Sequence, residues 1–151
     1  MTDDDVQSAV ATLLTGRPED ASRNEVAERS AVIRRLRGRL AATEVSYTRR
    51  ARELADTGQS EPAESLLGSA GGMGSKEADT ATAREDSCNE AADVEDALAD
   101  GDVTAAHADA MAAACNGLPE HLRAEFLAGE ERLRGRARVE VASRLPHGIR
   151  S

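Results

Sequence analysis

The residue in this sequence best suited to acid-base or metal chemistry is His107, which lies in the alanine-rich segment VTAAHADAMAAAC. An imidazole titrates near neutral pH and is a frequent metal ligand. A metal site needs several converging donors, and the remaining candidates, His121, His147, Cys88 and Cys115, show none of the spacings typical of zinc sites. The pattern favours a polar scaffold residue near a helix N-terminus, so we predict no catalytic residue, no metal and no cofactor.

Two other patterns resemble ligand sites, but their spacing does not fit. The segment GSAGGMGSK lacks the four-residue gap and the preceding strand of a phosphate-binding loop, which favours a hinge. A group of acidic residues lacks the spacing of a calcium loop, and we interpret it as a set of solvated helix faces. Its members are Asp93, Glu95, Asp96, Asp100 and Asp102.

Arginines cluster ahead of this acidic segment and are the best candidates for contact with a partner. Long arginine stems can cover apolar surface while the guanidinium groups meet carboxylates or phosphates. Two interpretations stay open: ion pairs with the acidic residues 77–109 of the same chain or of a second copy, or contacts with nucleic acid. The net charge of −9 argues against a general nucleic-acid binder. The candidate contacts are Arg34, Arg35, Arg37, Arg39, Arg49 and Arg50.

The composition predicts a helical protein with a thin core. Leu, Ile, Val and Phe together make up 25 of 151 residues, a low share for a globular domain, and Tyr47 and Phe126 are the only aromatic residues. Alanine compensates in part, because it is the best helix former and lets helices pack closely. We expect a marginally stable chain whose folding a partner completes.

The chain carries no sequence signal for secretion or for a membrane. Its first residues, MTDDDVQSAV, are acidic where a signal peptide would be basic, and no apolar run has the length of a membrane span. With two isolated cysteines, this pattern predicts a cytoplasmic protein without a membrane or small-molecule partner.

The spacing of apolar residues predicts an all-α fold with no sheet, in which one long helix over about residues 19–56 packs with several shorter helices. Apolar residues recur at strict sevens along this helix, as in a coiled coil or an antiparallel helix pair. Leu36 and Thr43 occupy two intermediate core positions, whereas Arg29 and Arg50 interrupt two others. We name the following residues the heptad stripe: Val26, Ile33, Leu40, Tyr47 and Leu54.

Three segments, VEDALADG, VTAAHADAMA and GLPEHLRAEFL, follow one another over the second half of the chain. In order and spacing they resemble domain-of-unknown-function family 222, an α-helical family common in actinobacteria, and the likeness covers about residues 31–133. His107 matches the helix histidine of that family, and the resemblance implies no role for it.

The resemblance implies an association with HNH nucleases, whose catalytic domain commonly follows the helical domain. This sequence lacks the aromatic, asparagine and paired-histidine pattern of an HNH site, so no catalytic residue carries over and the chain is not expected to be an enzyme. We expect an acidic N-terminal helix over residues 1–18, a helical domain resembling the family over 19–133, and a divergent arginine-rich tail over 134–151. The tail is expected to reflect a frameshift or early stop that truncated the protein before the nuclease domain.

These observations predict a non-catalytic helical module that associates with a second copy or with a partner helix. The alternative is a DNA-contacting accessory protein of a nuclease or mobile-element system.

Overall fold

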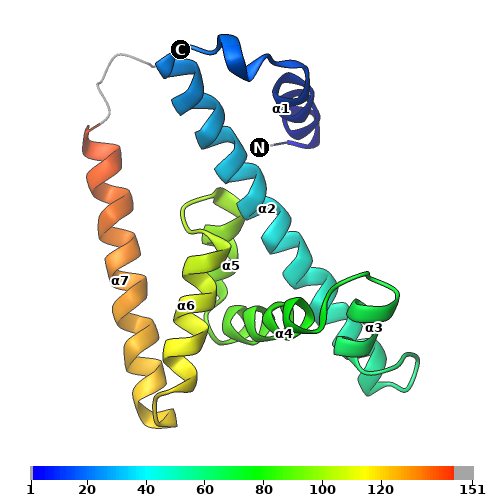
Figure 1. The fold of residues 1–151 in the computed structure, drawn as a ribbon. Coiled ribbons are helices and arrows are strands. Elements are labelled where there is room, and N and C mark those ends of the chain that lie inside the picture. Colours follow the sequence, from blue (N-terminus) through cyan, green and yellow to red (C-terminus); the bar gives the residue numbers. More distant parts are fainter. Residues whose placement is uncertain (1, 145–151) are drawn as a thin grey trace. The chain divides into compact units, whose positions relative to one another are not determined.

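The computed structural model describes residues 2–144, and the side chains of residues 2–136. This part of the chain contains helices and no strand, which confirms the all-α prediction (Figure 1). The last residues of the predicted tail, 145–151, lie outside the described residues. The elements are α1 (Asp3–Thr15), η1 (Pro18–Asp20), α2 (Arg23–Asp56), α3 (Ala63–Ser69), α4 (Ser75–Glu90), α5 (Ala92–Asp100), α6 (Ala105–Asn116) and α7 (Glu120–Arg144).

The long helix predicted from the heptad pattern is α2, which has 34 residues. Its first turn is fixed by a reciprocal cap: Glu25 N donates to Ser22 Oγ at 3.2 Å, and Ser22 N donates to a Glu25 carboxylate oxygen at 3.2 Å. Such a pair satisfies two backbone donors that a helix N-terminus leaves open. The helix therefore begins at Arg23, a few residues after the predicted start, because Pro18–Asp20 forms a separate 3-10 turn.

The chain divides into two compact units, residues 1–110 and 111–151. In the first unit α2 is the central element, and α3, α4 and α5 pack along it. The helix α1 lies beside the N-terminal half of α2 (Figure 1). The second unit is a hairpin of the end of α6 and α7, in which Leu118 N donates to Cys115 O at 3.0 Å and the Arg123 guanidinium donates to Leu118 O at 3.1 Å.

The core of the first unit is centred on a close crossing of α2 and α5. Val94 and Leu98 of α5 are completely buried, and Val45 of α2 is 1% exposed. Small residues allow the approach, because a Cβ atom on Gly38 would lie 2.4 Å from the carbonyl oxygen of Leu98. At the end of α5, Gly101 has φ of +76° and lies against the backbone of α2, so both features of this position favour glycine.

The heptad stripe is not the face on which α2 packs within the chain. Val26, Ile33, Leu40 and Tyr47 are exposed, with Leu40 at 69% and Tyr47 at 72%, whereas Leu54 is half-buried. Within the described part of the chain no helix covers this stripe from Val26 to Tyr47, and the coiled coil or antiparallel helix pair stays a prediction. The stripe is not the packing face because small residues let the neighbouring helices approach α2 more closely elsewhere. The buried residues of α2 are Gly38, Ala41, Ala42, Val45, Thr48 and Ala51.

None of the helices in the described part of the chain is both long and apolar enough to cross a membrane.

We predict that Gly38→Ala destabilises the first unit. The added methyl group would meet the Leu98 carbonyl, and overpacking of this kind costs about 1–3 kcal/mol, more than the gain in helix propensity from alanine. Urea unfolding followed by circular dichroism measures the change in the free energy of unfolding. Gly129→Ala is the matched control, because a Cβ atom there meets nothing within 4 Å and should leave stability equal or higher. Equal effects of the two substitutions would contradict the close crossing.

Candidate protein-association surface

Arg49 shows how the arginine cluster is used inside the first unit. Its guanidinium donates to the two carboxylate oxygens of Glu95 on α5, at 2.8 and 3.4 Å, and to the side-chain oxygen of Asn89 at 3.1 Å. The hydrogen bond with Glu95 raises the pKa of Arg49 above its usual value. This pair joins the arginine cluster to the acidic segment of the same chain, which is one of the two interpretations left open by the sequence.

Two other arginines of the cluster form exposed ion pairs. Arg39 donates to Asp3 on α1 at 3.1 Å, and the Asp3 side chain is 92% exposed. Arg50 pairs with Glu53, one turn further along α2, at 3.0 Å. Exposed pairs contribute at most about 1 kcal/mol each, so both can exchange one partner for another at little cost.

The remaining three arginines of the cluster, Arg34, Arg35 and Arg37, come just before Gly38 on α2. Arg34 donates to the backbone carbonyl of Asp102 at 3.2 Å. Arg35 and Arg37 are exposed and form no ion pair or hydrogen bond with the residues that the structure describes. The structure therefore divides the six candidates into four with intramolecular partners and two that are open to solvent.

Arg84 of α4 makes a contact with α6 that the sequence did not indicate. Its guanidinium makes two 2.8 Å hydrogen bonds with the carboxylate of Asp109 and a 3.3 Å contact with Glu44. The Arg84 side chain is only 12% exposed, and the hydrogen bond with Asp109 raises its pKa. Paired hydrogen bonds in this geometry are among the stronger charged contacts, so Arg84 fastens α6 and α2 to α4.

Glu85 of α4 is the most deeply buried charged residue among the described side chains, at 2% exposed. One of its carboxylate oxygens lies 2.8 Å from Arg52 and the other 3.7 Å from Arg49, and Asn89 donates a hydrogen bond to it. A buried carboxylate is tolerated only when such partners compensate for its lost hydration. The sequence offered no signal for this role, because it indicates only that Glu85 belongs to the acidic residues 77–109.

His107 is an exposed residue in the first turn of α6, and its backbone N donates to Thr104 Oγ at 3.1 Å. The threonine therefore caps the helix in which the histidine lies. Across the described residues, no group of three or more His, Cys, Asp or Glu side chains is arranged to hold a metal ion. The assignment of His107 as a scaffold residue stays a prediction.

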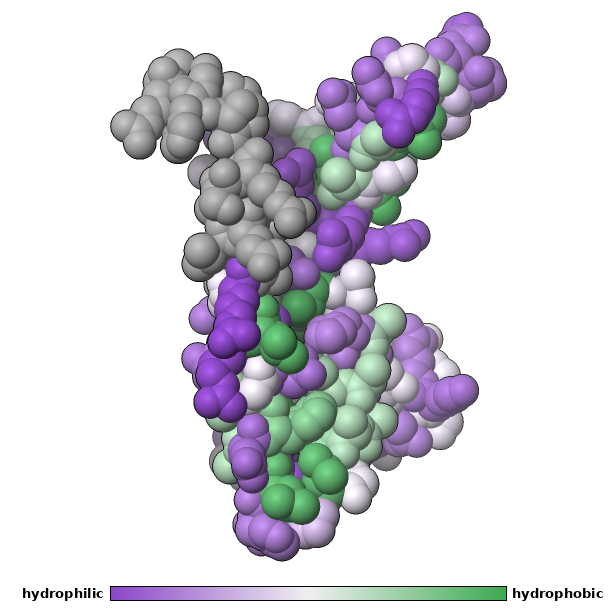
Figure 2. Space-filling view, turned by 90° about the vertical axis from the view of Figure 1, so that its left-hand side faces the viewer, coloured by the Kyte–Doolittle hydropathy of each residue, from purple (hydrophilic) through white to green (hydrophobic). Residues whose placement is uncertain are grey.

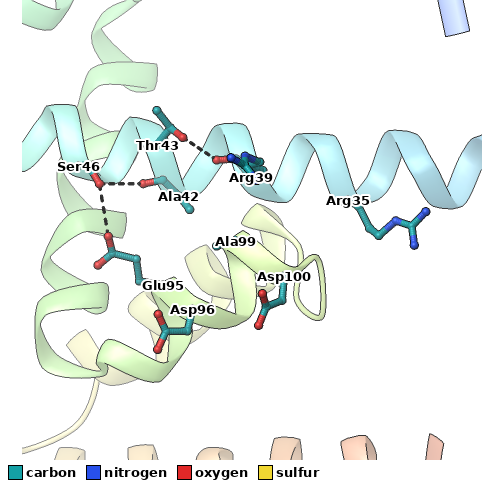
Figure 3. Close-up of a pocket in the computed structure, with 9 residues that line it drawn as sticks. All are labelled: Arg35, Arg39, Ala42, Thr43, Ser46, Glu95, Asp96, Ala99 and Asp100. Atoms are coloured by element: carbon teal, nitrogen blue, oxygen red, sulfur yellow. Dashed lines mark hydrogen bonds between the residues drawn. The ribbon is translucent and has the colours of Figure 1, made fainter. Parts of the chain in front are cut away.

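A groove of about 640 Å³ lies between α2 and α5, and its two walls carry opposite charges. Arg35 and Arg39 lie on the α2 wall, and Figure 3 shows Glu95, Asp96 and Asp100 on the facing helix. Ser46 and Glu95 lie 3.5 Å apart across the groove. Because carboxylates face this groove, it is poorly suited to a phosphate group.

Several large apolar side chains of the protein are exposed to solvent. The face seen in Figure 2 shows hydrophobic residues between hydrophilic ones. Among the exposed large apolar residues of the first unit, most belong to α2, where they are members of the heptad stripe. Among the side chains that the structure describes, the exposed large apolar residues are Val10, Leu14, Val26, Ile33, Leu40, Tyr47, Leu122 and Leu133. An exposed apolar row of this kind marks a candidate interaction surface.

Comparisons with protein-family models, with curated proteins and with solved structures found no match to this chain.

The burial of Cys88 should make the stability of the protein depend on pH. The thiol is 1% exposed, and burial raises its pKa to about 11. In the unfolded chain a cysteine ionises near pH 8.5, so between about pH 9 and 11 only the unfolded state releases the proton. The free energy of unfolding must then fall as the pH rises, by up to about 2 kcal/mol. Urea unfolding at several pH values should show this fall, and Cys88→Ala should reduce it; identical slopes would contradict the burial.

Proposed function

We propose that this chain is a non-catalytic helical module that acts by binding another protein, or a second copy of itself, along the heptad stripe of α2. The observation that supports the proposal most directly is the exposure of Val26, Ile33, Leu40 and Tyr47, at 53%, 39%, 69% and 72%. Exposing these side chains in one row is unfavourable in water, and covering them with a partner helix would remove that cost.

The spacing of the heptad stripe supports a helix as the partner. Residues that repeat every seven positions stay on one side of a supercoiled helix and fit between side chains of a facing helix. Tyr47 is a suitable anchor, because tyrosine offers a large apolar area and a polar tip and is enriched among the residues that dominate binding energy. The thin, alanine-rich core of the chain would also benefit from the added apolar contact.

The resemblance to domain-of-unknown-function family 222 supports a setting for this module. Members of that family commonly precede HNH nuclease domains, so the partner we propose is part of a nuclease system. In that setting the chain supplies binding, and the nuclease chemistry belongs to another domain.

A benzophenone photo-cross-linker placed at Tyr47 tests the association. We expect irradiation of cells that make the protein to yield adducts with another protein or with a second copy, identified by mass spectrometry. The same cross-linker at Lys76, an exposed position on α4, is the control and should give no such adduct. Leu40→Ser should abolish the adduct at Tyr47, because it removes an apolar contact of the same stripe. If the two positions give the same products, the proposal is wrong.

The alternative function, contact with DNA, rests on Arg35 and Arg37, the two arginines of the cluster without an intramolecular partner among the described residues. Neutralising phosphates with arginine gives binding that weakens steeply as salt is added. A titration of a labelled duplex at about 50 mM salt, repeated at about 200 mM, tests this alternative. We expect no measurable binding at either concentration, since Asp96 and Asp100 face the groove that Arg35 lines and repel phosphates there, and the chain carries a net charge of −9. Binding at low salt that Arg37→Glu abolishes would favour the DNA function instead.

A further inference from the structure

The heptad stripe lies on the side of α2 opposite α5. Gly38 and Ala42 face α5, whereas Ile33 and Leu40 lie about half a turn away around the axis of α2. The stripe closes beyond Tyr47, where Ala51 is buried and Leu54 is half-buried. An incoming helix would therefore lie along residues 26–47.

The charges that surround this part of α2 are mainly positive. Residues 26–47 contain five arginines and two glutamates, which gives a net charge of +3 in a chain whose total is −9. Arg37 is next to the stripe, is exposed, and forms no ion pair or hydrogen bond with a described residue. An apolar row flanked by arginines matches an apolar row flanked by carboxylates.

The chain itself contains a helix with an acidic first turn, α1, beside the N-terminal half of α2. The first three residues of α1 are aspartates, and the helix carries no basic residue. It approaches α2 through the pair between Asp3 and Arg39, and its C-terminal end at Gly16 lies against the guanidinium of Arg29. This arrangement covers a flank of α2, pairs an arginine of α2 with a carboxylate, and leaves the stripe exposed from Val26 to Tyr47.

A second copy of the chain fits the stripe less well than an acidic helix does. In a parallel pair the two basic halves of α2 would lie side by side. In an antiparallel pair centred on the exposed stripe, residues 26–47, the midpoint falls between Leu36 and Arg37, so the two Arg37 side chains would meet. Like charges at such positions oppose pairing.

We infer that the heptad stripe is a docking site for an amphipathic helix of a partner protein, with apolar residues at heptad spacing and glutamate or aspartate on both flanks. This inference rests on the proposed function, since it names the class of partner that the association surface selects.

The test uses the full chain and two synthetic helices of about three heptads, each with leucine at the core positions. One helix has glutamate and the other lysine at the flanking positions, so the two differ only in charge and each repels itself. Fluorescence anisotropy of the labelled helices measures binding at low and moderate salt. We expect the acidic helix to bind, binding to weaken as salt is added, and the basic helix not to bind.

Three variants link the binding to the stripe. Leu40→Ser should weaken binding of the acidic helix about tenfold, which corresponds to losing the burial of one leucine side chain. Arg37→Glu should weaken it about fivefold, as expected for a partly exposed charge pair, and should improve binding of the basic helix. Lys76→Glu makes the same charge reversal at an exposed site on α4 and should have no effect. Leu40 and Arg37 are exposed, so circular dichroism should show that both variants fold normally.

The outcomes separate this inference from the proposed function. Equal binding of the two helices, or binding that Arg37→Glu leaves unchanged, would overturn the acidic-partner inference. If neither helix binds but light scattering shows a dimer that Leu40→Ser dissociates, the association function stands and its partner is a second copy. If the cross-linker at Tyr47 also gives no adduct, both the inference and the proposed function are wrong.

Discussion

The close approach of α5 to α2 at Gly38 is the contact on which the first unit depends. A protein with few large apolar residues cannot build a deep core, so the stabilisation has to come from helices whose backbones lie close together. At this crossing the Leu98 carbonyl occupies the space of a missing side chain, and Val45, Val94 and Leu98 fill the layer beside it. Where alanines and glycines line the contact, little side-chain entropy is lost on packing.

Ion pairs then orient the helices around this crossing. Arg84 joins Asp109 and Glu44, and Arg49 joins Glu95, so charged contacts connect α2, α4, α5 and α6. Glu85 shows what such pairing requires. Its carboxylate is nearly inaccessible to water, so arginines from α2 have to compensate for its lost hydration. Replacing one member of such a buried pair leaves an uncompensated charge, so these contacts select one packing even where they add little net stability.

The use of small residues at the helix contacts also explains why an apolar row is left on the surface of α2. The small residues face α5 and α4, and the large residues of the heptad stripe from Val26 to Tyr47 are exposed to solvent. A helix with two apolar faces can hold its own unit together with one and bind a partner with the other. The arginines divide in the same way, since Arg49 is committed to intramolecular pairing whereas Arg37 is exposed beside the stripe.

The sequence alone determined the helical class and the existence of the long helix, because alanine content, caps and the absence of alternating patterns act locally. It also indicated the arginine cluster, and pairing with the acidic segment, as between Arg49 and Glu95, was one of the two interpretations it left open. Only the tertiary structure decided which face of α2 is buried. Heptad spacing records that Ile33 and Leu40 share one face, but it carries no information about the competing contact at Gly38, which forms between residues about sixty positions apart in the chain. The roles of Arg84 and Glu85 were hidden for the same reason: burial and partners of a charged side chain follow from distant elements rather than from its neighbours in sequence.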